Sequence, residues 1–130
     1  MIPGVIRRIH EAKTNDYDTI TIWGNGETRR EFMYAGDLAD FVSENIDKIE
    51  KLPQNMNIGL GTDYSIKEYY EVIAKIVGYE GYFEYDLSKP EGMKQKLVDI
   101  KEQKKLGWEP KISLYKGISN AYNHYLEMYE

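Results

Sequence analysis

The sequence predicts a small α/β fold with few short strands and about five helices, forming a single domain over residues 1–130. Runs with helical apolar spacing follow short strand-like runs along the chain, and no linker or low-complexity stretch separates them. A length of 130 residues suits one compact domain, because two domains would each have too little core. The predicted strands are too few for a doubly wound sheet of the usual size.

Composition and charge exclude several classes of protein. The chain is 42% hydrophobic and 30% charged, which is ordinary for a globular protein and argues against disorder. No apolar run reaches the ~20 residues that cross a bilayer and no signal peptide opens the sequence, so we expect no membrane contact and a cytoplasmic location. An excess of 22 acidic over 17 basic residues disfavours a nucleic-acid partner.

Cysteine and histidine usage limits the chemistry further. The absence of cysteine excludes disulfides, thiolate metal sites and cysteine nucleophiles. His10 and His124 lie far apart and have no partner at metal-ligand spacing, so we predict no metal site.

The first third of the chain predicts one helix and two strands. A helix over residues 3–13 follows from a first-turn proline and an apolar stripe of Ile2, Val5, Ile6, Ile9 and Ala12. Residues 19–23 alternate as a half-buried strand does, and residues 30–34 read as a second strand. Between them, Gly24-Asn25-Gly26 predicts a hairpin turn.

The middle of the chain predicts two helices with a strand between them. Asp37 is expected to open a helix whose buried face carries Leu38, Phe41, Val42, Ile46 and Ile49. Residues 56–60 read as a short buried strand. Ser65 with Glu68 predicts a capping box for the next helix, which Gly78 ends.

The last third predicts a strand, an extended segment and two helices. Residues 82–85 form the strand, and an extended stretch reaches Leu97 after a loop at 89–92. Asp99 is expected to cap a two-turn helix that Gly107 stops. Ser113 is expected to cap the final helix, over residues 114–128.

Three motifs imitate catalytic or cofactor signatures. Gly24-x-Gly26 and Gly59-x-Gly61 lack the third glycine of a dinucleotide loop, and Gly26 leads into a predicted strand rather than a helix. Tyr85 and Lys89 have the spacing of a catalytic tyrosine–lysine pair, but the following proline disfavours the helical turn that would stack them. We therefore predict no catalytic and no cofactor-binding residue in this chain.

Scattered cations offer one positive hypothesis. If Arg8, Arg30 and Lys96 converge, they form a pocket for a diphosphate, because guanidinium groups match phosphate oxygens bidentately. Trp23 could then pack against a base or sugar. From spacing alone, the alternative is a set of unrelated surface cations.

Short motifs occur in a fixed order across nearly the whole chain: Ile2-Pro3-Gly4-Val5-Ile6-Arg7-Arg8, Trp23-Gly24-Asn25-Gly26, Arg30-Glu31-Phe32, Asn57-Ile58-Gly59, Ser65-Ile66-Lys67-Glu68, Ser88-Lys89-Pro90-Glu91-Gly92, Lys96-Leu97-Val98-Asp99 and Leu106-Gly107-Trp108-Glu109-Pro110. The ordered set resembles the C-terminal substrate-binding domain of the GDP-L-fucose synthases, which are extended short-chain dehydrogenase/reductases of the NAD-dependent epimerase/dehydratase family. The Ser-Lys-Pro loop favours this branch over its sister epimerases.

The resemblance implies the substrate-binding part of an oxidoreductase and isomerase. In the family, an N-terminal Rossmann domain binds NADP and carries the catalytic serine, tyrosine and lysine, and the C-terminal domain binds the GDP-sugar. The full enzyme converts GDP-4-keto-6-deoxymannose to GDP-L-fucose. The chain resembles only the C-terminal part of such an enzyme, so we expect a truncated form that has no Rossmann domain and is inactive alone.

The resemblance also implies a set of substrate-binding residues: Arg8, Trp23, Arg30, Glu91 and Lys96. Glu91 stands where the family more often has aspartate. Residues 34–36 depart from the family's usual His-Val-Asp, and residues 93–95 depart from its usual Thr-Pro-Arg. The nucleotide and sugar therefore stay open.

Two alternatives concern partners. Beside the interpretation as a GDP-sugar-binding domain, two hypotheses stay open: a split subunit that completes an enzyme with a separate Rossmann domain, and a ligand-free module that binds protein. A face that would pack on a Rossmann domain should be apolar and exposed, which predicts a homo-oligomer or capture of such a domain.

Overall fold

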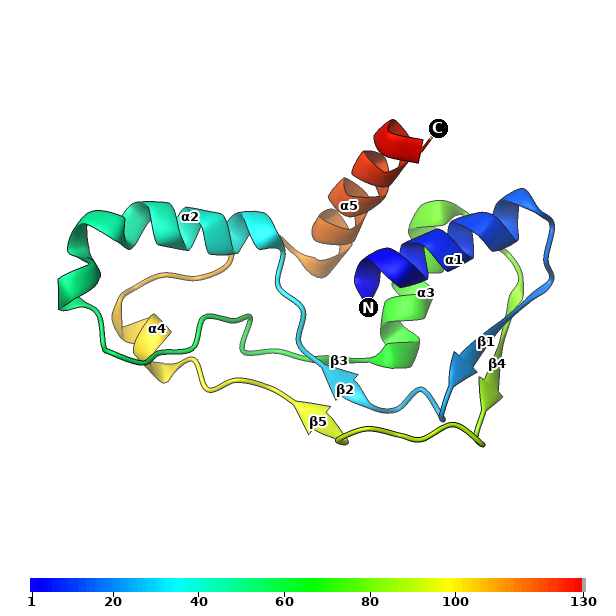
Figure 1. Cartoon of the computed structure of the whole chain (residues 1–130), viewed down its shortest axis with the longest axis horizontal. Helices are drawn as coiled ribbons and strands as arrows, with labels where there is room; N and C mark the ends of the chain where they lie inside the picture. The colour runs from blue at the N-terminus through cyan, green and yellow to red at the C-terminus, as the bar shows by residue number, and fades with distance from the viewer. Residues whose placement is uncertain (130) are drawn as a thin grey trace.

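The computed structural model describes residues 1–129, and in that part it confirms a small α/β fold with five α-helices and few strands (Figure 1). Their order is α1 Ile2–Thr14, β1 Thr19–Trp23, β2 Arg29–Arg30, α2 Ala35–Asn45, the 3-10 helix η1 Ile46–Lys51, β3 Tyr64–Ser65, α3 Ile66–Val77, β4 Tyr82–Asp86, β5 Gln95–Lys96, α4 Lys101–Lys105 and α5 Leu114–Tyr129.

The main core lies where α1, α3 and α5 meet beside the β1–β4 pair (Figure 1). The predicted apolar stripe of α1 is confirmed, and Ile6 and Ile9 of α1 and Ile73 of α3 are fully buried within this core. β1 and β4 pair in parallel, and β1 turns Ile20 and Ile22 inward as its alternation predicts. Burial of these side chains is the main term that stabilises this half of the molecule.

Both ends of α3 are fixed by local sequence. The predicted capping box is confirmed, since the Glu68 amide donates to Ser65 Oγ at 3.1 Å and the Ser65 amide donates to Glu68 Oε2 at 2.6 Å. Gly78 ends the helix with a φ of +74°, a left-handed conformation that suits glycine. α3 therefore begins and ends where the sequence predicts.

The predicted hairpin is wrong. β1 pairs with β4, whereas β2 pairs antiparallel with β3 and parallel with β5, so the two expected hairpin strands lie in different sheets. Gly24 and Gly26, with φ of +72° and +77°, turn the chain from one sheet toward the other. The predicted strand 30–34 is also too long, because only the first residue of that segment belongs to β2. A local pattern does not show which distant strand takes up the hydrogen bonds of β1.

The predicted burial of α2 is wrong on most of its face. Phe41 is buried against the Trp108 ring, with centroids 5.1 Å apart. The other apolar side chains of the stripe are between 44% and 65% exposed: Leu38, Val42, Ile46 and Ile49. α2 lies at the end of the molecule away from β1 and β4 (Figure 1), and no element of residues 1–129 covers that stripe.

Asp37 does not cap α2, which begins two residues earlier at Ala35. Its buried carboxylate instead accepts hydrogen bonds from the Lys111 and Ile112 amides, each at 3.1 Å. Asp37 therefore joins α2 to the segment before α5, which is a role that local capping rules do not predict.

The strand predicted at 56–60 is not formed in the structure. Gly59 donates its amide to Gln103 Oε1 at 2.8 Å and accepts from Gln103 Nε2 at 3.0 Å. A side-chain amide from α4 thus takes the place that a neighbouring strand would occupy.

The C-terminal helices start close to their predicted caps. The Lys101 amide donates to Asp99 Oδ1 at 2.9 Å, and the Lys116 amide donates to Ser113 Oγ at 3.3 Å. α4 is shorter than two turns, at five residues. Among residues 1–129, no helix combines the length and apolar character that crossing a bilayer needs.

Candidate functional site

The β2–β5 pair brings together two of the predicted binding residues. Arg30 of β2 is the register partner of Lys96 of β5. Directly paired residues on neighbouring strands project to the same face of a sheet. The two cationic side chains therefore leave paired backbone positions on the same face of the sheet, which is the placement that the diphosphate hypothesis requires of them.

Arg30 is held by main-chain oxygens rather than by a carboxylate. Its Nη1 donates to the carbonyls of Arg29, at 2.6 Å, and Met93, at 2.7 Å. The Tyr69 hydroxyl donates to the Arg30 carbonyl at 2.9 Å. Within residues 1–129, no ion pair involves Arg30 or Lys96. Their two positive charges are thus left without a protein counter-ion in that part of the chain.

Trp23 and Glu91 form a second group, where β1 ends. The Asn25 amide donates to Glu91 Oε1 at 3.1 Å, which fixes the loop after β4 against the turn after β1. Trp23 is 67% exposed, and the Lys89 ammonium lies 5.5 Å from its ring centroid. This is a cation–π arrangement at an accessible indole.

An open hollow of about 430 Å³ lies next to this second group. Of the five predicted binding residues only Glu91 lines it, and the others around it are Asn25, Glu27, Thr28, Arg29, Lys94 and Gln95.

Arg8 does not reach the other cations through any contact in the structure. Its Nη1 donates to the Tyr70 hydroxyl at 3.0 Å and its Nη2 donates to the Thr21 carbonyl at 2.7 Å. The first bond ties α1 to α3, and the second ties α1 to β1 two residues before Trp23. The structure therefore pairs Arg30 with Lys96 in strand register, places Glu91 against the turn that follows Trp23, and leaves Arg8 bonded to the β1 main chain.

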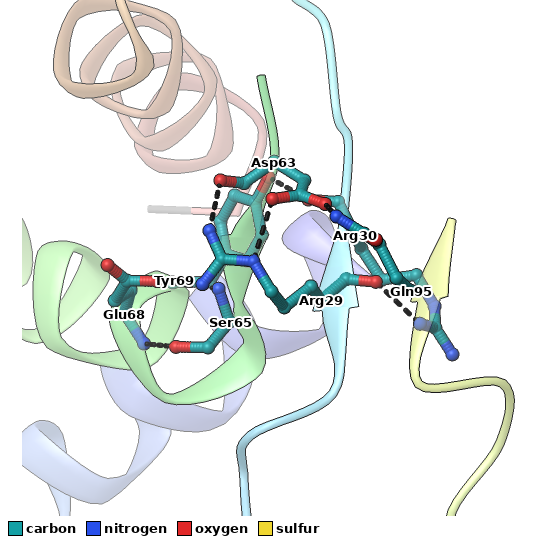
Figure 2. A network of polar contacts seen from close by, with 7 residues as sticks. All are labelled: Arg29, Arg30, Asp63, Ser65, Glu68, Tyr69 and Gln95. Carbon is teal, nitrogen blue, oxygen red and sulfur yellow. Dashed lines mark hydrogen bonds and ion pairs between the residues drawn. The ribbon is translucent and has the colours of Figure 1, made fainter. Parts of the chain in front are cut away.

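A polar network links the three short strands, and the sequence reasoning missed it (Figure 2). Asp63 accepts a hydrogen bond from Arg29 Nε at 2.7 Å and another from Gln95 Nε2 at 2.5 Å. These bonds, from Gln95 first and Arg29 second, hold the pKa of Asp63 below its usual value. Next to it, burial raises the pKa of Tyr69 to about 12.

The rejected motifs take other roles in the structure. Gly26 leads toward β2 rather than into a helix, so its loop does not have the shape of a dinucleotide-phosphate site. Tyr85 lies against Gly26, whereas Lys89 lies over Trp23, so this pair does not stack as a catalytic couple. Across the described residues, His, Asp and Glu side chains nowhere gather in a group of three that could hold a metal ion.

Comparison with known proteins gives consistent results. The model of the NAD-dependent epimerase/dehydratase family matches residues 1–59. GDP-L-colitose synthase of Yersinia pseudotuberculosis is 52% identical over 126 residues, which are 97% of this chain and 41% of that protein. GDP-L-fucose synthase of Azorhizobium caulinodans is 41% identical over 133 residues, covering 100% of this chain and 43% of that protein.

A solved structure agrees with these relatives. GDP-mannoheptose C4 reductase from Campylobacter jejuni, with NADP bound, is 32% identical with a TM-score of 0.78, over 96% of this chain and 44% of that one. The chain thus spans about two fifths of the length of the curated relatives that it matches. In sequence and fold the chain is therefore similar to a C-terminal portion of the GDP-L-fucose and GDP-L-colitose synthases, and its residues 1–59 are similar to the NAD-dependent epimerase/dehydratase family.

Proposed function

We propose that the chain binds a GDP-sugar of the GDP-4-keto-6-deoxymannose or GDP-L-fucose class, as the substrate-binding part of an NADP-dependent epimerase and reductase in the cytoplasm. The observation that carries this proposal is the Arg30–Lys96 pair, which lies in strand register without a carboxylate partner in the described residues. Two adjacent cations favour a ligand with two adjacent negative charges, and a diphosphate has that form. The relatives, which are a GDP-L-colitose synthase and a GDP-L-fucose synthase, supply the nucleotide and the sugar class of this proposal.

The remaining predicted residues complete the proposed site. The exposed Trp23 ring offers an apolar face to a base or sugar. Glu91 uses Oε1 for the Asn25 amide, and its second oxygen is the one offered to a ligand hydroxyl or N–H. Arg8 contributes by holding β1 in place. Hydride transfer then belongs to a separate domain that binds NADP.

Calorimetric titration with GDP tests the proposal. With only part of a cleft present we expect a dissociation constant near 1 mM, about −4 kcal/mol. Arg30→Ala should weaken binding at least tenfold, because it removes one of the paired cations. Arg7→Ala is the matched control, since Arg7 is also an arginine but lies exposed on α1, where it is paired with Glu11 at 2.7 Å. Absence of saturable GDP binding at millimolar concentration would favour the ligand-free alternative.

The exposed stripe of α2 and η1 supports a second element of the proposal. We infer that Leu38, Val42, Ile46 and Ile49 pack against a cofactor-binding domain of the kind carried by the relatives, whose length is more than twice the matched part. Docking would bury apolar surface of each of these side chains and stabilise the complex by roughly 25 cal/mol for every Å² buried. A split enzyme would then be completed by association of the two parts.

The partner inference is tested by mixing the chain with the N-terminal portion of the Yersinia relative and following sedimentation and NADPH oxidation. Val42→Glu with Ile46→Glu should abolish association, since the new charges face the docking surface. Ser43→Glu is the control, because it adds a charge to an exposed position of the same helix. A concentration-dependent dimer of the chain alone, disrupted by the same double variant, would replace this partner with a second copy.

A further inference from the structure

The three-stranded sheet that carries Arg30 and Lys96 is very small. β2, β3 and β5 are each two residues long. So short a ladder has few main-chain hydrogen bonds, and a slip of one residue would turn each side chain to the opposite face. Something besides the ladder must therefore set the register that places Arg30 opposite Lys96.

Asp63 has the contacts to do this from the residue before β3. It is only 7% exposed. Its Oδ1 accepts from Arg29 Nε at 2.7 Å, and its main-chain oxygen accepts from Arg29 Nη2, also at 2.7 Å. Its Oδ2 accepts from Gln95 Nε2 at 2.5 Å. One residue thus bonds to β2 on one side and to β5 on the other, as Figure 2 shows.

The geometry separates the clamp from the cations. Arg29 is the register partner of Gln95, and Arg30 is the register partner of Lys96. Because side chains alternate along a strand, the first pair projects to one face of the sheet and the second pair to the other. Fixing Arg29 and Gln95 at Asp63 therefore fixes the spacing of the two cations behind them.

The charges explain why the clamp is needed. Arg30 and Lys96 repel each other when no anion is bound, and in residues 1–129 they have no ion-pair partner. Arg29 is held on Asp63 and also lies 3.7 Å from Glu68 Oε2. The negative charge of the network thus lies on the face opposite the cations, where it secures the strands without neutralising the candidate site.

We propose that Asp63 is a positioning residue that clamps β2 to β5 through Arg29 and Gln95, and thereby presents Arg30 and Lys96 at the spacing that binds a diphosphate. This inference rests on the proposed function. Asp63 itself is not proposed to touch the ligand.

The test uses two variants of the full chain and two measurements. Asp63→Asn keeps the shape and removes the charge, and Gln95→Leu removes only the bond to β5. Asp40→Asn is the matched control, because Asp40 is exposed on α2. Amide hydrogen exchange is measured at Arg29, whose amide donates to the Lys94 carbonyl at 2.8 Å between β2 and β5, and at Ile73 in the core. Binding of GDP and of inorganic pyrophosphate is measured by titration.

We expect both variants to speed exchange at Arg29 at least tenfold, to leave exchange at Ile73 unchanged, and to weaken pyrophosphate and GDP binding about tenfold. A merely structural role for Asp63 would instead raise exchange at Arg29 and Ile73 together, and that result would overturn the inference. Unchanged exchange and affinity in both variants would overturn it as well. If the wild-type chain binds neither ligand, the proposed function fails, and exchange at Arg29 alone decides whether Asp63 acts as a clamp.

Discussion

Gln103→Leu should destabilise the chain strongly although it replaces a polar residue by an apolar one of similar volume. Gln103 is 0% exposed, and its amide makes both a donor and an acceptor bond to the Gly59 main chain. Leucine leaves two buried backbone groups unpaired, at about 1–3 kcal/mol each. Against this, the apolar side chain gains about 1 kcal/mol from burial. The expected net loss is about 3 kcal/mol, a large part of the ~5–15 kcal/mol typical of a whole domain.

Urea unfolding followed by circular dichroism measures this loss as a shift of the midpoint at constant slope. Gln54→Leu serves as the control, because Gln54 is exposed and the same substitution there should leave the free energy of unfolding unchanged. A loss below about 1 kcal/mol for Gln103→Leu would refute the reasoning, since it would mean that water reaches Gly59 once the amide is gone. Gln103→Glu is a second test, because a glutamate side chain can donate to the Gly59 carbonyl only when its carboxyl group is protonated.

Three further outcomes follow from single contacts. Ser65→Ala removes the capping box of α3 and should cost about 1 kcal/mol in thermal unfolding. Tyr69→Phe removes the bond to the Arg30 carbonyl at a cost of about 1 kcal/mol; it should also flatten the loss of stability as pH rises from 10 toward the raised pKa of about 12, because only the neutral phenol suits the buried site. The lowered pKa values of Asp63 and Glu68 contribute stability that is present above their ordinary values of 3.8 and 4.5 and is lost as pH falls below them; acid unfolding of Asp63→Asn should therefore be less steep.

A helix could be predicted from the sequence where local residues cap both of its ends and its apolar face packs against the core of the same chain. α3 carries its start and end signals in Ser65 and Gly78, and its apolar spacing matches its burial. The β1 alternation is equally clear, but its partner β4 lies more than fifty residues away. Nothing local distinguishes such a pairing from a hairpin at Gly24-Asn25-Gly26, so the strand was predictable and the topology was not.

The α2 stripe and the 56–60 segment show a different limit. Their patterns describe surfaces that are apolar or strand-like, and a pattern cannot say whether the covering surface lies in the same chain. For the candidate site, residue types could be identified through resemblance, but Asp63 and Gln95 could not. Their role arises only from the meeting of β2, β3 and β5, whose residues lie far apart in sequence.

The two tryptophans of the chain give it a built-in pair of optical reporters. Trp108 is 6% exposed and packs on Phe41, so its emission should be blue-shifted and poorly quenched by iodide. Trp23 stands in solvent under the Lys89 ammonium, so its emission should be red-shifted and readily quenched. The long-wavelength part of the emission therefore reports on the end of β1, and the short-wavelength part reports on the α2 end, so one emission spectrum can distinguish ligand binding from docking of a partner.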